Sequence, residues 1–286
     1  SRFRKDFSMM TYAALLGSLE LGLIYAILAL GVFLSYRTLN TPDLTVDGSI
    51  VTGAAVSAML CSAEVHPLLA LLAAFAAGAC AGAVTSLLNI KLHIEPLLSG
   101  ILVMLGLYSI NMHIMGNRAN VALLKSPTLY KLTQEAFSEC SFTGLLTGGA
   151  FLLVLAVLFY LFLNTRLGYA LRATGDNEAM VRASGINSNA MKILGLALSN
   201  GFVGLAGGLL AQYQSYAEIG MGTGMVVIGL ASVIIGETIF ECFSKSLPLA
   251  VRLTAVCVGA VLYRLAIASA INAGMPANDL KLISAL

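Results

Sequence analysis

The stretch Pro67-Leu-Leu-Ala-Leu-Leu-Ala-Ala-Phe-Ala-Ala-Gly-Ala-Cys-Ala-Gly-Ala-Val-Thr-Ser-Leu-Leu-Asn-Ile90 decides the fold, because it is long, apolar and without a charged side chain. A helix needs about 20 mostly apolar residues to cross the hydrocarbon core of a bilayer. The alternating pattern of a transmembrane β-strand is missing. Because backbone groups in lipid must find partners within the segment itself, the stretch predicts a transmembrane helix.

Runs of the same kind recur along the whole chain. Long ones cover residues 12–36, 96–117, 144–163 and 193–217, and shorter or interrupted ones cover 48–63, 219–236 and 246–278. The first contains one charge, Glu20, and the last is interrupted by Arg252 and Arg264. We therefore expect an all-α, polytopic bundle of about 8–10 membrane segments, some of them short or broken, in a single domain over residues 1–286.

The composition agrees with a membrane protein. Only 10% of the 286 residues are charged and 58% are hydrophobic, whereas a soluble domain carries about 25% charged residues. A net charge of +2 is too small to favour nucleic acid. The three histidines are scattered, so neither a metal site nor a cofactor is expected.

Two segments are polar enough to lie in water. The segment 164–192 has four basic residues, Arg166, Arg172, Arg182 and Lys192. Excess positive charge in a short loop predicts the cytoplasmic side. The segment 117–143 has a more even balance of charge and is expected on the outside.

The crossing count does not agree with a basic N-terminus inside the cell, since five crossings would then leave 164–192 outside. Three resolutions are open. In the first, Met9 or Met10 is the natural start, and the basic residues before it do not belong to the natural chain. In the second, the region 38–63 is broken or re-entrant. In the third, the segment 117–143 contains another short membrane segment. We favour a break near 38–63.

Residues 17–63 and 195–236 show the same order: a Gly-rich helix, a polar stretch and a short Gly-containing run. Paired interrupted segments are typical of transport pathways. The alternative is that glycine is simply common in membrane helices.

Polar groups inside a membrane are costly and mark candidate pathway positions. The candidates are Asp47, Asn111, Asn200, Gln212 and Glu237. For Asn111 and Asn200 the alternative is a hydrogen bond between helices. For Glu237 it is a position facing the cytoplasm.

The segment Arg172-Ala-Thr-Gly-Asp-Asn-Glu-Ala-Met-Val-Arg-Ala-Ser-Gly-Ile-Asn187 predicts a short helix over 178–184. Asn177 is a suitable N-cap, Glu178 suits the first turn, and Gly185 is a suitable stop. Such a helix could seat in a groove of a soluble partner. It could also be an ordinary connector on the membrane surface.

This segment resembles the coupling loop of ABC-transporter permeases of the branched-chain amino acid and ribose importer superfamily. The matching residues are Arg172, Ala173, Gly175, Asn177, Ala179, Gly185, Ile186 and Asn187. Met180 stands where other ABC importers have a second alanine, and the glycine follows Glu178 by seven residues rather than six. The resemblance implies an ATPase-coupling role for Arg172, Gly175, Asp176, Asn177, Glu178, Ala179, Arg182, Gly185, Ile186 and Asn187.

The resemblance extends over about residues 12–286. The stretches Gly229–Glu237, Tyr263–Arg264 and Asp279–Ile283 are similar to the subgroup commonly labelled uncharacterised or tryptophan/tyrosine-type ABC permeases. Members of this family usually continue with another apolar run after the last of these stretches, so we expect that the natural chain is longer.

The resemblance implies a multi-pass permease subunit of the plasma (inner) membrane, without catalytic residues. No Gly-x-x-x-x-Gly-Lys-Ser/Thr motif is present, so ATP would be hydrolysed elsewhere. Implied partners are two copies of an ABC ATPase, an extracytoplasmic solute-binding protein and a second permease copy in a homodimer. The expected solute is an amino acid, aromatic as a first guess. The alternatives are a sugar or nucleoside importer, an ion-coupled secondary transporter and a membrane-embedded enzyme.

Overall fold

The apolar runs fold into long helices. The computed structural model of the chain describes residues 2–124, 126–136, 142–242 and 248–272. The helices are α1 (Arg2–Val32), α2 (Thr45–Ser62), α3 (Pro67–Leu92), α4 (Pro96–Ile114), α5 (Leu129–Ala136), α6 (Thr143–Leu163), α7 (Arg166–Asp176), α8 (Glu178–Ala183), α9 (Ser188–Gln214), α10 (Met225–Glu241) and α11 (Leu249–Asn272), with a π-helix η1 (Phe33–Thr38) and strands β1 (Asn120–Ala122) and β2 (Tyr216–Glu218).

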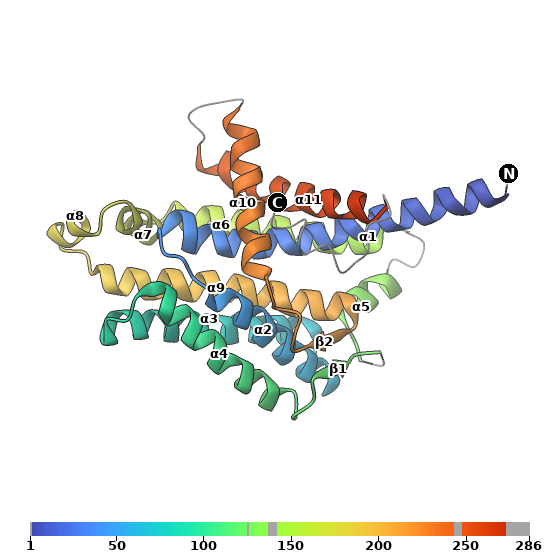
Figure 1. Cartoon of the computed structure of the whole chain (residues 1–286), viewed down its shortest axis with the longest axis horizontal. Coiled ribbons are helices and arrows are strands. Elements are labelled where there is room, and N and C mark those ends of the chain that lie inside the picture. Colours follow the sequence, from blue (N-terminus) through green and yellow to red (C-terminus); the bar gives the residue numbers. More distant parts are fainter. Residues whose placement is uncertain (1, 125, 137–141, 243–247, 273–286) are drawn as a thin grey trace.

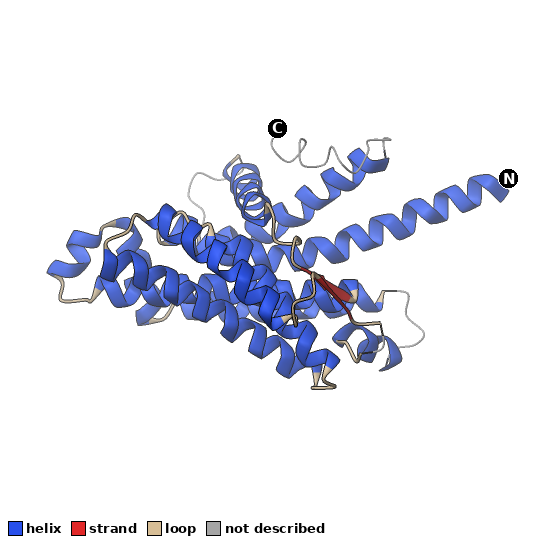
Figure 2. Cartoon of the chain, turned by 60° about the horizontal axis from the view of Figure 1, so that its bottom comes forward, coloured by secondary structure: helices blue, strands red, loops and turns tan. Residues whose placement is uncertain are grey.

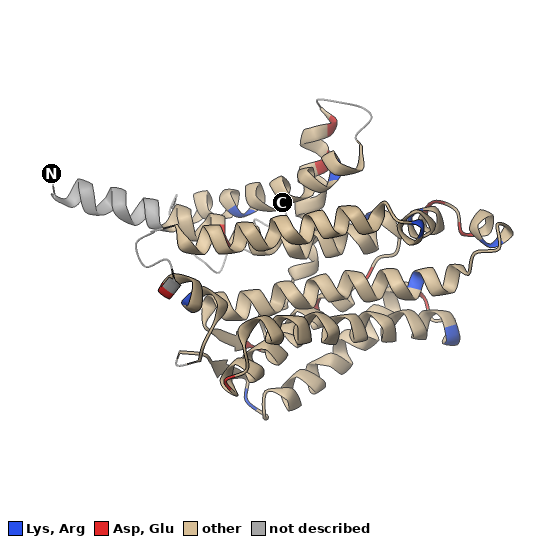
Figure 3. Ribbon diagram, turned by 180° about the vertical axis from the view of Figure 1, so that it is seen from behind, with Lys and Arg blue, Asp and Glu red and all other residues tan. Residues whose placement is uncertain are grey.

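Within the described residues, seven helices are long and apolar enough to cross a membrane. They are α1 with η1, α2, α3, α4, α6, α9 and α11. Helix α10 has 17 residues and lies at a steep angle to the others (Figure 1). Helices dominate Figure 2, and charged residues lie mostly toward the ends of the bundle in Figure 3. The prediction of a polytopic all-α bundle is confirmed.

The two polar segments lie at opposite ends of the bundle (Figure 1). Helices α7 and α8 are at one end, and α5 with the two strands is at the other. Five of the seven long helices precede α7. Because five is an odd number, α1 starts at the end opposite to α7 and α8. The start of α1 and the loop 164–192 therefore lie on opposite sides of the membrane, and all five helices can cross it.

The expected break in the first apolar region is present between Thr38 and Thr45. The helix widens into η1, where the Leu39 amide donates to the Leu34 carbonyl over five residues. It then stops, because Asn40 has φ 51° and Pro42 disfavours a helical residue before it. The Asp43 Oδ1 atom accepts from the Thr45 amide at 2.8 Å and starts α2. However, α2 remains long enough to span, so the break removes no crossing.

Helices α2, α3 and α9 form the core of the bundle through close backbone contacts. A Cβ atom on Gly53 of α2 would overlap the carbonyl of Gly204 on α9, and one on Gly78 of α3 would overlap the carbonyl of Asn200. Small residues allow this approach in lipid, where dispersion contacts hold helices together. In the most apolar part of α9, 78% of the residues are buried, whereas the corresponding share for α6 is 17%. Helix α6 therefore presents its surface to lipid or to another chain.

The segment 117–143 contains no further span among its described residues. Its strand β1 pairs antiparallel with β2, with Val121 opposite Ala217, and α5 has eight residues. The Lys131 ammonium donates to the carbonyls of Leu123, Leu124 and Ser126. Lys125 and Glu139, which contribute to the charge balance of this loop, and the stretch Asp279–Ile283 near the end lie outside the described residues.

The proposed sequence repeat corresponds to two helix–break–helix units. In the first, α1 and α2 flank the break at 39–44. In the second, α9 and α10 flank β2 and the turn that follows it. The two units meet where the Asp47 carboxylate of α2 accepts from the amides of Gly224 and Val226 at the start of α10.

Candidate functional site

The loop between α6 and α9 contains two capped helices, α7 and α8, and leads into the capped start of α9. Thr165 caps α7 by accepting from the Gly168 amide. Asn177 caps α8 by accepting from the Met180 amide at 3.0 Å, and Asn187 caps α9 through the Ala190 amide. Each side chain satisfies an amide that would otherwise have no partner at a helix start. The predicted short helix is present, with Gly185 at φ 80° just after its end.

Glu178 fixes α8 to the start of α9. Its Oε1 atom accepts from Arg182 Nη2 at 2.6 Å, and its Oε2 atom accepts from Lys192 Nζ at 2.7 Å. Ser188 adds a third bond at 3.1 Å. The hydrogen bond from Lys192 holds the pKa of the Glu178 carboxyl below its usual range, against the opposing effect of partial burial.

The outer surface of α8 is exposed at the end of the bundle. Met180 is 64% exposed, while Val181 on the opposite side is buried against the rest of the loop. Of the predicted coupling residues, Asp176, Asn177, Ala179, Arg182, Gly185, Ile186 and Asn187 are exposed. A rigid, capped helix with small side chains around one methionine can enter a groove on a partner.

The inner surface of α7 contacts the break in the first apolar region. Gly175 lies against the carbonyl of Thr38, and a Cβ atom at this position would overlap it. The Leu39 side chain packs against Gly195 of α9, and the Leu171 side chain also reaches this glycine. Gly175, one of the predicted coupling residues, is therefore a point of close backbone contact between the loop and the end of η1.

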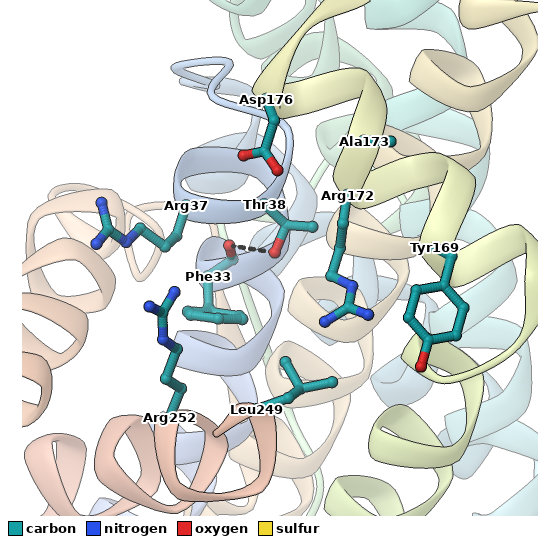
Figure 4. Close-up of a pocket in the computed structure, with 9 residues that line it drawn as sticks. All are labelled: Phe33, Arg37, Thr38, Tyr169, Arg172, Ala173, Asp176, Leu249 and Arg252. Atoms are coloured by element: carbon teal, nitrogen blue, oxygen red, sulfur yellow. Dashed lines mark hydrogen bonds between the residues drawn. The ribbon is translucent and has the colours of Figure 1, made fainter. Parts of the chain in front are cut away.

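The coupling candidates Arg172 and Asp176 line a cavity of about 480 Å³ between η1, α7 and the start of α11 (Figure 4). Arg37 and Arg252 line the same cavity from η1 and α11. The Arg172 guanidinium lies 4.6 Å from the centre of the Tyr169 ring. Arg37 forms an ion pair of 3.2 Å with Glu237 of α10. Sequence reasoning noticed Arg252 without assigning it, and it missed Arg37.

Asn200 and Gln212, two of the pathway candidates, have hydrogen-bond partners on other segments of the bundle. Asn200 donates to Asp43 Oδ2 at 2.6 Å and accepts from Ser49 Oγ at 2.7 Å. Gln212 donates to Ser57 Oγ at 3.0 Å and accepts from the Leu129 amide at 2.9 Å. These bonds match the alternative stated for Asn200, a hydrogen bond between helices. Asp43, which is 6% exposed, was missed as a site, although its place after Pro42 in a polar break was a usable signal.

The candidates Asp47 and Asn111 come together at a second cavity of about 220 Å³, lined by α2, α4 and the turn before α10. Asn111 is 1% exposed and donates to the Gly48 carbonyl at 3.3 Å. Its Oδ1 atom is buried without a hydrogen-bond partner among the described residues. Glu237 does not line this cavity, since it pairs with Arg37 at the other site.

Comparisons with known proteins agree with this architecture. Residues 14–286 match the family described as the permease component of a branched-chain amino acid transport system. A tyrosine transport system permease protein of Clostridioides difficile (strain R20291) is 42% identical over 92% of this chain and 85% of its own length. The ribose import permease protein of Escherichia coli (strain K12) is 31% identical over 75% of this chain and 66% of its own length. No solved structure matches.

The fold, the capped loop and these matches define the class of protein as a multi-pass transport permease of the inner membrane. The chain belongs to the branched-chain amino acid transport system permease family, and it is a permease component of an ABC-type transport system.

Proposed function

We propose that the chain is the membrane-spanning subunit of an ATP-driven importer, and that α8 docks on the ATPase subunit. The observation that carries the proposal is the exposed, doubly capped helix α8, which Glu178 fixes to α9. Its outer surface offers Met180 and small neighbours to a groove. Its rigid attachment would transmit a movement of the ATPase rather than absorb it.

The coupling route that we propose leads from α8 through α7 to the break at 39–44. Gly175 lies on the Thr38 carbonyl without a side chain between them, so a displacement of α7 displaces the end of η1. Within the break, Asp43 accepts a hydrogen bond from Asn200 of α9. Movement of the loop would thus reach the core of the bundle through packed contacts.

The assembly that we propose follows the family pattern: two permease copies, two ATPase subunits and an extracytoplasmic binding protein. The end with α7 and α8 faces the cytoplasm, which agrees with its basic residues. The opposite end, with β1, β2 and α5 (Figure 1), receives the solute from the binding protein.

The solute that we propose is an amino acid, with an aromatic one as the first candidate. The support is the 42% identical relative that is named for tyrosine transport. A sugar or nucleoside is the alternative, because a ribose permease is also a relative. The cavity of Asp47 and Asn111 is our candidate for part of the pathway, since the unpaired Asn111 oxygen can accept a hydrogen bond from a solute.

An ion-coupled transporter would need acidic groups inside the membrane, and Asp47 and Glu237 are the candidates for them. Asp47 accepts from two backbone amides of α10, and Glu237 pairs with Arg37. Neither carboxylate is therefore arranged as an empty ion site, and no other observation favours this alternative.

The test is solute uptake and ATP hydrolysis by the permease and ATPase together in proteoliposomes. Met180→Arg changes an exposed side chain and leaves the caps of α8 intact, so the protein should fold. We expect uptake to fall about tenfold or more, as for a central contact of an interface. Lys91→Ala, at an exposed residue near the end of α3, is the control and should transport normally. Normal uptake by Met180→Arg would contradict the docking assignment.

A second arm of the experiment tests the solute and its pathway. Tyrosine, leucine and ribose are offered separately, each with its binding protein. Asn111→Leu should lower uptake of the true solute while basal ATP hydrolysis stays within about twofold, because this residue lies away from α8 and α7. If Asn111→Leu transports like the unmodified chain, the cavity is not part of the pathway.

A further inference from the structure

Two cavities of different character lie on neighbouring faces of α11. The first is the charged cavity of about 480 Å³ between η1, α7 and α11 (Figure 4). The second is an apolar groove of about 530 Å³ between α1, α6 and α11. Leu249 and Arg252 line the first, and Ala250 and Leu253 line the second. The two cavities therefore adjoin along the first turns of α11.

The charged cavity has more positive groups than its own carboxylate can balance. Arg37, Arg172 and Arg252 line it together with Asp176. Glu237 pairs with Arg37, and Asp176 forms no ion pair with any arginine among the described residues. Two guanidinium groups thus face a single carboxylate, and the cavity carries net positive charge.

Two of the arginines in this cavity, Arg172 and Arg252, form no ion pair among the described residues. Arg172 Nε is buried without a hydrogen-bond partner among the described residues. The Arg252 side chain also forms no ion pair there. A buried donor without a partner is costly and calls for an acceptor that the protein itself does not provide. Planar guanidinium groups in pairs are well suited to the oxygen atoms of a phosphate.

The surroundings favour a phosphate that is attached to an apolar body. Phe33 and Leu249 line the charged cavity alongside the arginines. The cavity lies at the α7 end of the bundle (Figure 1). The ends of membrane-spanning helices lie at the level of the lipid headgroups. Basic pockets between helices at this level attract the headgroups of acidic lipids.

The apolar groove has the direction that an acyl chain would need. Along α11 its lining runs from Ala250 to Val258, which is about 12 Å at 1.5 Å per residue. On α6 it runs from Tyr160 back to Gly149. The groove thus starts beside Arg252 and leads toward the middle of the membrane.

We propose that these two cavities together form a binding site for an anionic phospholipid of the leaflet on the α7 side. The phosphate group binds Arg172 and Arg252, and one acyl chain lies in the groove between α6 and α11. A lipid in this position contacts η1, α7 and α11 at once, so it holds together the elements around the break. The site does not depend on the import direction or on the solute.

The experiment is native mass spectrometry of the purified full-length chain, delipidated in detergent and titrated with defined probes. The probes are dioleoyl phosphatidylglycerol, dioleoyl phosphatidylcholine and inorganic phosphate. We expect retention of phosphatidylglycerol with at least about fivefold preference over phosphatidylcholine, and no competition from inorganic phosphate. Loss of one arginine contact corresponds to about fivefold in affinity, so Arg252→Gln should weaken phosphatidylglycerol binding by that factor and Arg252→Lys should largely restore it.

Two variants control for charge and for folding. Arg166→Gln removes an exposed arginine that does not line the cavity and should bind like the unmodified chain. Gly149→Phe leaves the arginines in place and fills the inner end of the groove, where the nearest atom to an added Cβ would be Leu23 Cδ1 at 3.9 Å. It should weaken lipid binding as well, while size-exclusion chromatography confirms that it is folded.

The proposal is overturned by any of three results: equal retention of both lipids by the unmodified chain, unchanged phosphatidylglycerol binding by folded Arg252→Gln and Gly149→Phe, or displacement of the lipid by inorganic phosphate. A lipid-free dimer whose formation requires Arg252 would overturn it too, since a second copy of the chain would then occupy the surface.

Discussion

The polar groups in the core of the bundle and those in the charged cavity are arranged in opposite ways. In the core, Asn200 uses both its amide donor and its oxygen on neighbouring helices. In the cavity between η1, α7 and α11, Arg172 Nε is buried without an acceptor, and Arg252 forms no ion pair among the described residues. A polar group with all of its partners holds helices together, whereas a buried group without them suits a ligand. This difference separates structural from binding positions among residues that the sequence alone presents as equal.

We expect the largest loss of stability when the close backbone contacts in the core are disturbed. Gly53→Val places a branched side chain onto the backbone of Gly204. A Cβ atom added to Gly53 would overlap the Gly204 carbonyl and would lie 2.6 Å from the Gly204 Cα atom. We expect a loss of more than about 4 kcal/mol, enough to prevent folding. Gly106→Ala is the control, since a Cβ atom there meets nothing within 4 Å. Yield and monodispersity in size-exclusion chromatography measure both, and a folded Gly53→Val protein would contradict the packing.

The two buried asparagines provide the next comparison. Asn200→Leu leaves the Asp43 carboxylate and the Ser49 hydroxyl without their partner, so we expect a loss of about 3 kcal/mol. Asn111→Leu removes only one bond of 3.3 Å and should cost less than about 1 kcal/mol. Thermal unfolding in detergent distinguishes them. Equal losses of unfolding free energy would show that the number of hydrogen bonds does not distinguish Asn200 from Asn111.

The loop should respond to pH through Glu178. The ionised carboxylate is stabilised by Lys192, so its pKa is lowered in the folded protein. This stabilisation is fully present above the pKa of the unfolded chain, about 4.3, and is lost as the pH falls through the lower folded value. Glu178→Gln should destabilise α8 by less than about 1 kcal/mol at pH 7, since the pair is partly exposed. Hydrogen-exchange protection of α8 measures it, and a difference that did not shrink as the pH was lowered from neutral into the acid range would contradict the ion pair as the cause.

The smallest effect on stability is expected in the charged cavity. Arg252 has no ion pair among the described residues, so Arg252→Gln should change the unfolding free energy in lipid-free detergent by less than about 0.5 kcal/mol. The same thermal unfolding assay as for Asn200→Leu applies. A loss as large as that of Asn200→Leu would show that the cavity arginine is structural and would remove the contrast between the two regions.

The fold class and the capped loop could be predicted from the sequence because both depend on local chemistry. Uncharged runs of sufficient length can only be helices in lipid, and Asn177 and Gly185 have strong positional preferences. The break at 39–44 was also visible, since Pro42 interrupts the helix. The side on which the chain begins was not, because it depends on whether every apolar run crosses the membrane.

The partners of the intramembrane polar residues could not be predicted, because they come from distant segments. Asp47 meets the amides of Gly224 and Val226 only when α10 is placed, and Arg37 meets Glu237 in the same way. The residues of the charged cavity come from three segments far apart in the chain. Hydropathy identifies a costly group, but only the fold shows which groups are compensated.

The most direct test of the central claim, that α8 is the contact with the ATPase, is site-directed cross-linking in the assembled transporter. Single cysteines replace Met180, on the exposed surface of α8, or Lys91, which is also exposed, in a chain whose five native cysteines are replaced. A short bifunctional reagent should join Met180→Cys to the ATPase subunit in high yield, with little product from Lys91→Cys. A transport-competent Met180→Cys protein that forms no more product than Lys91→Cys would contradict the account.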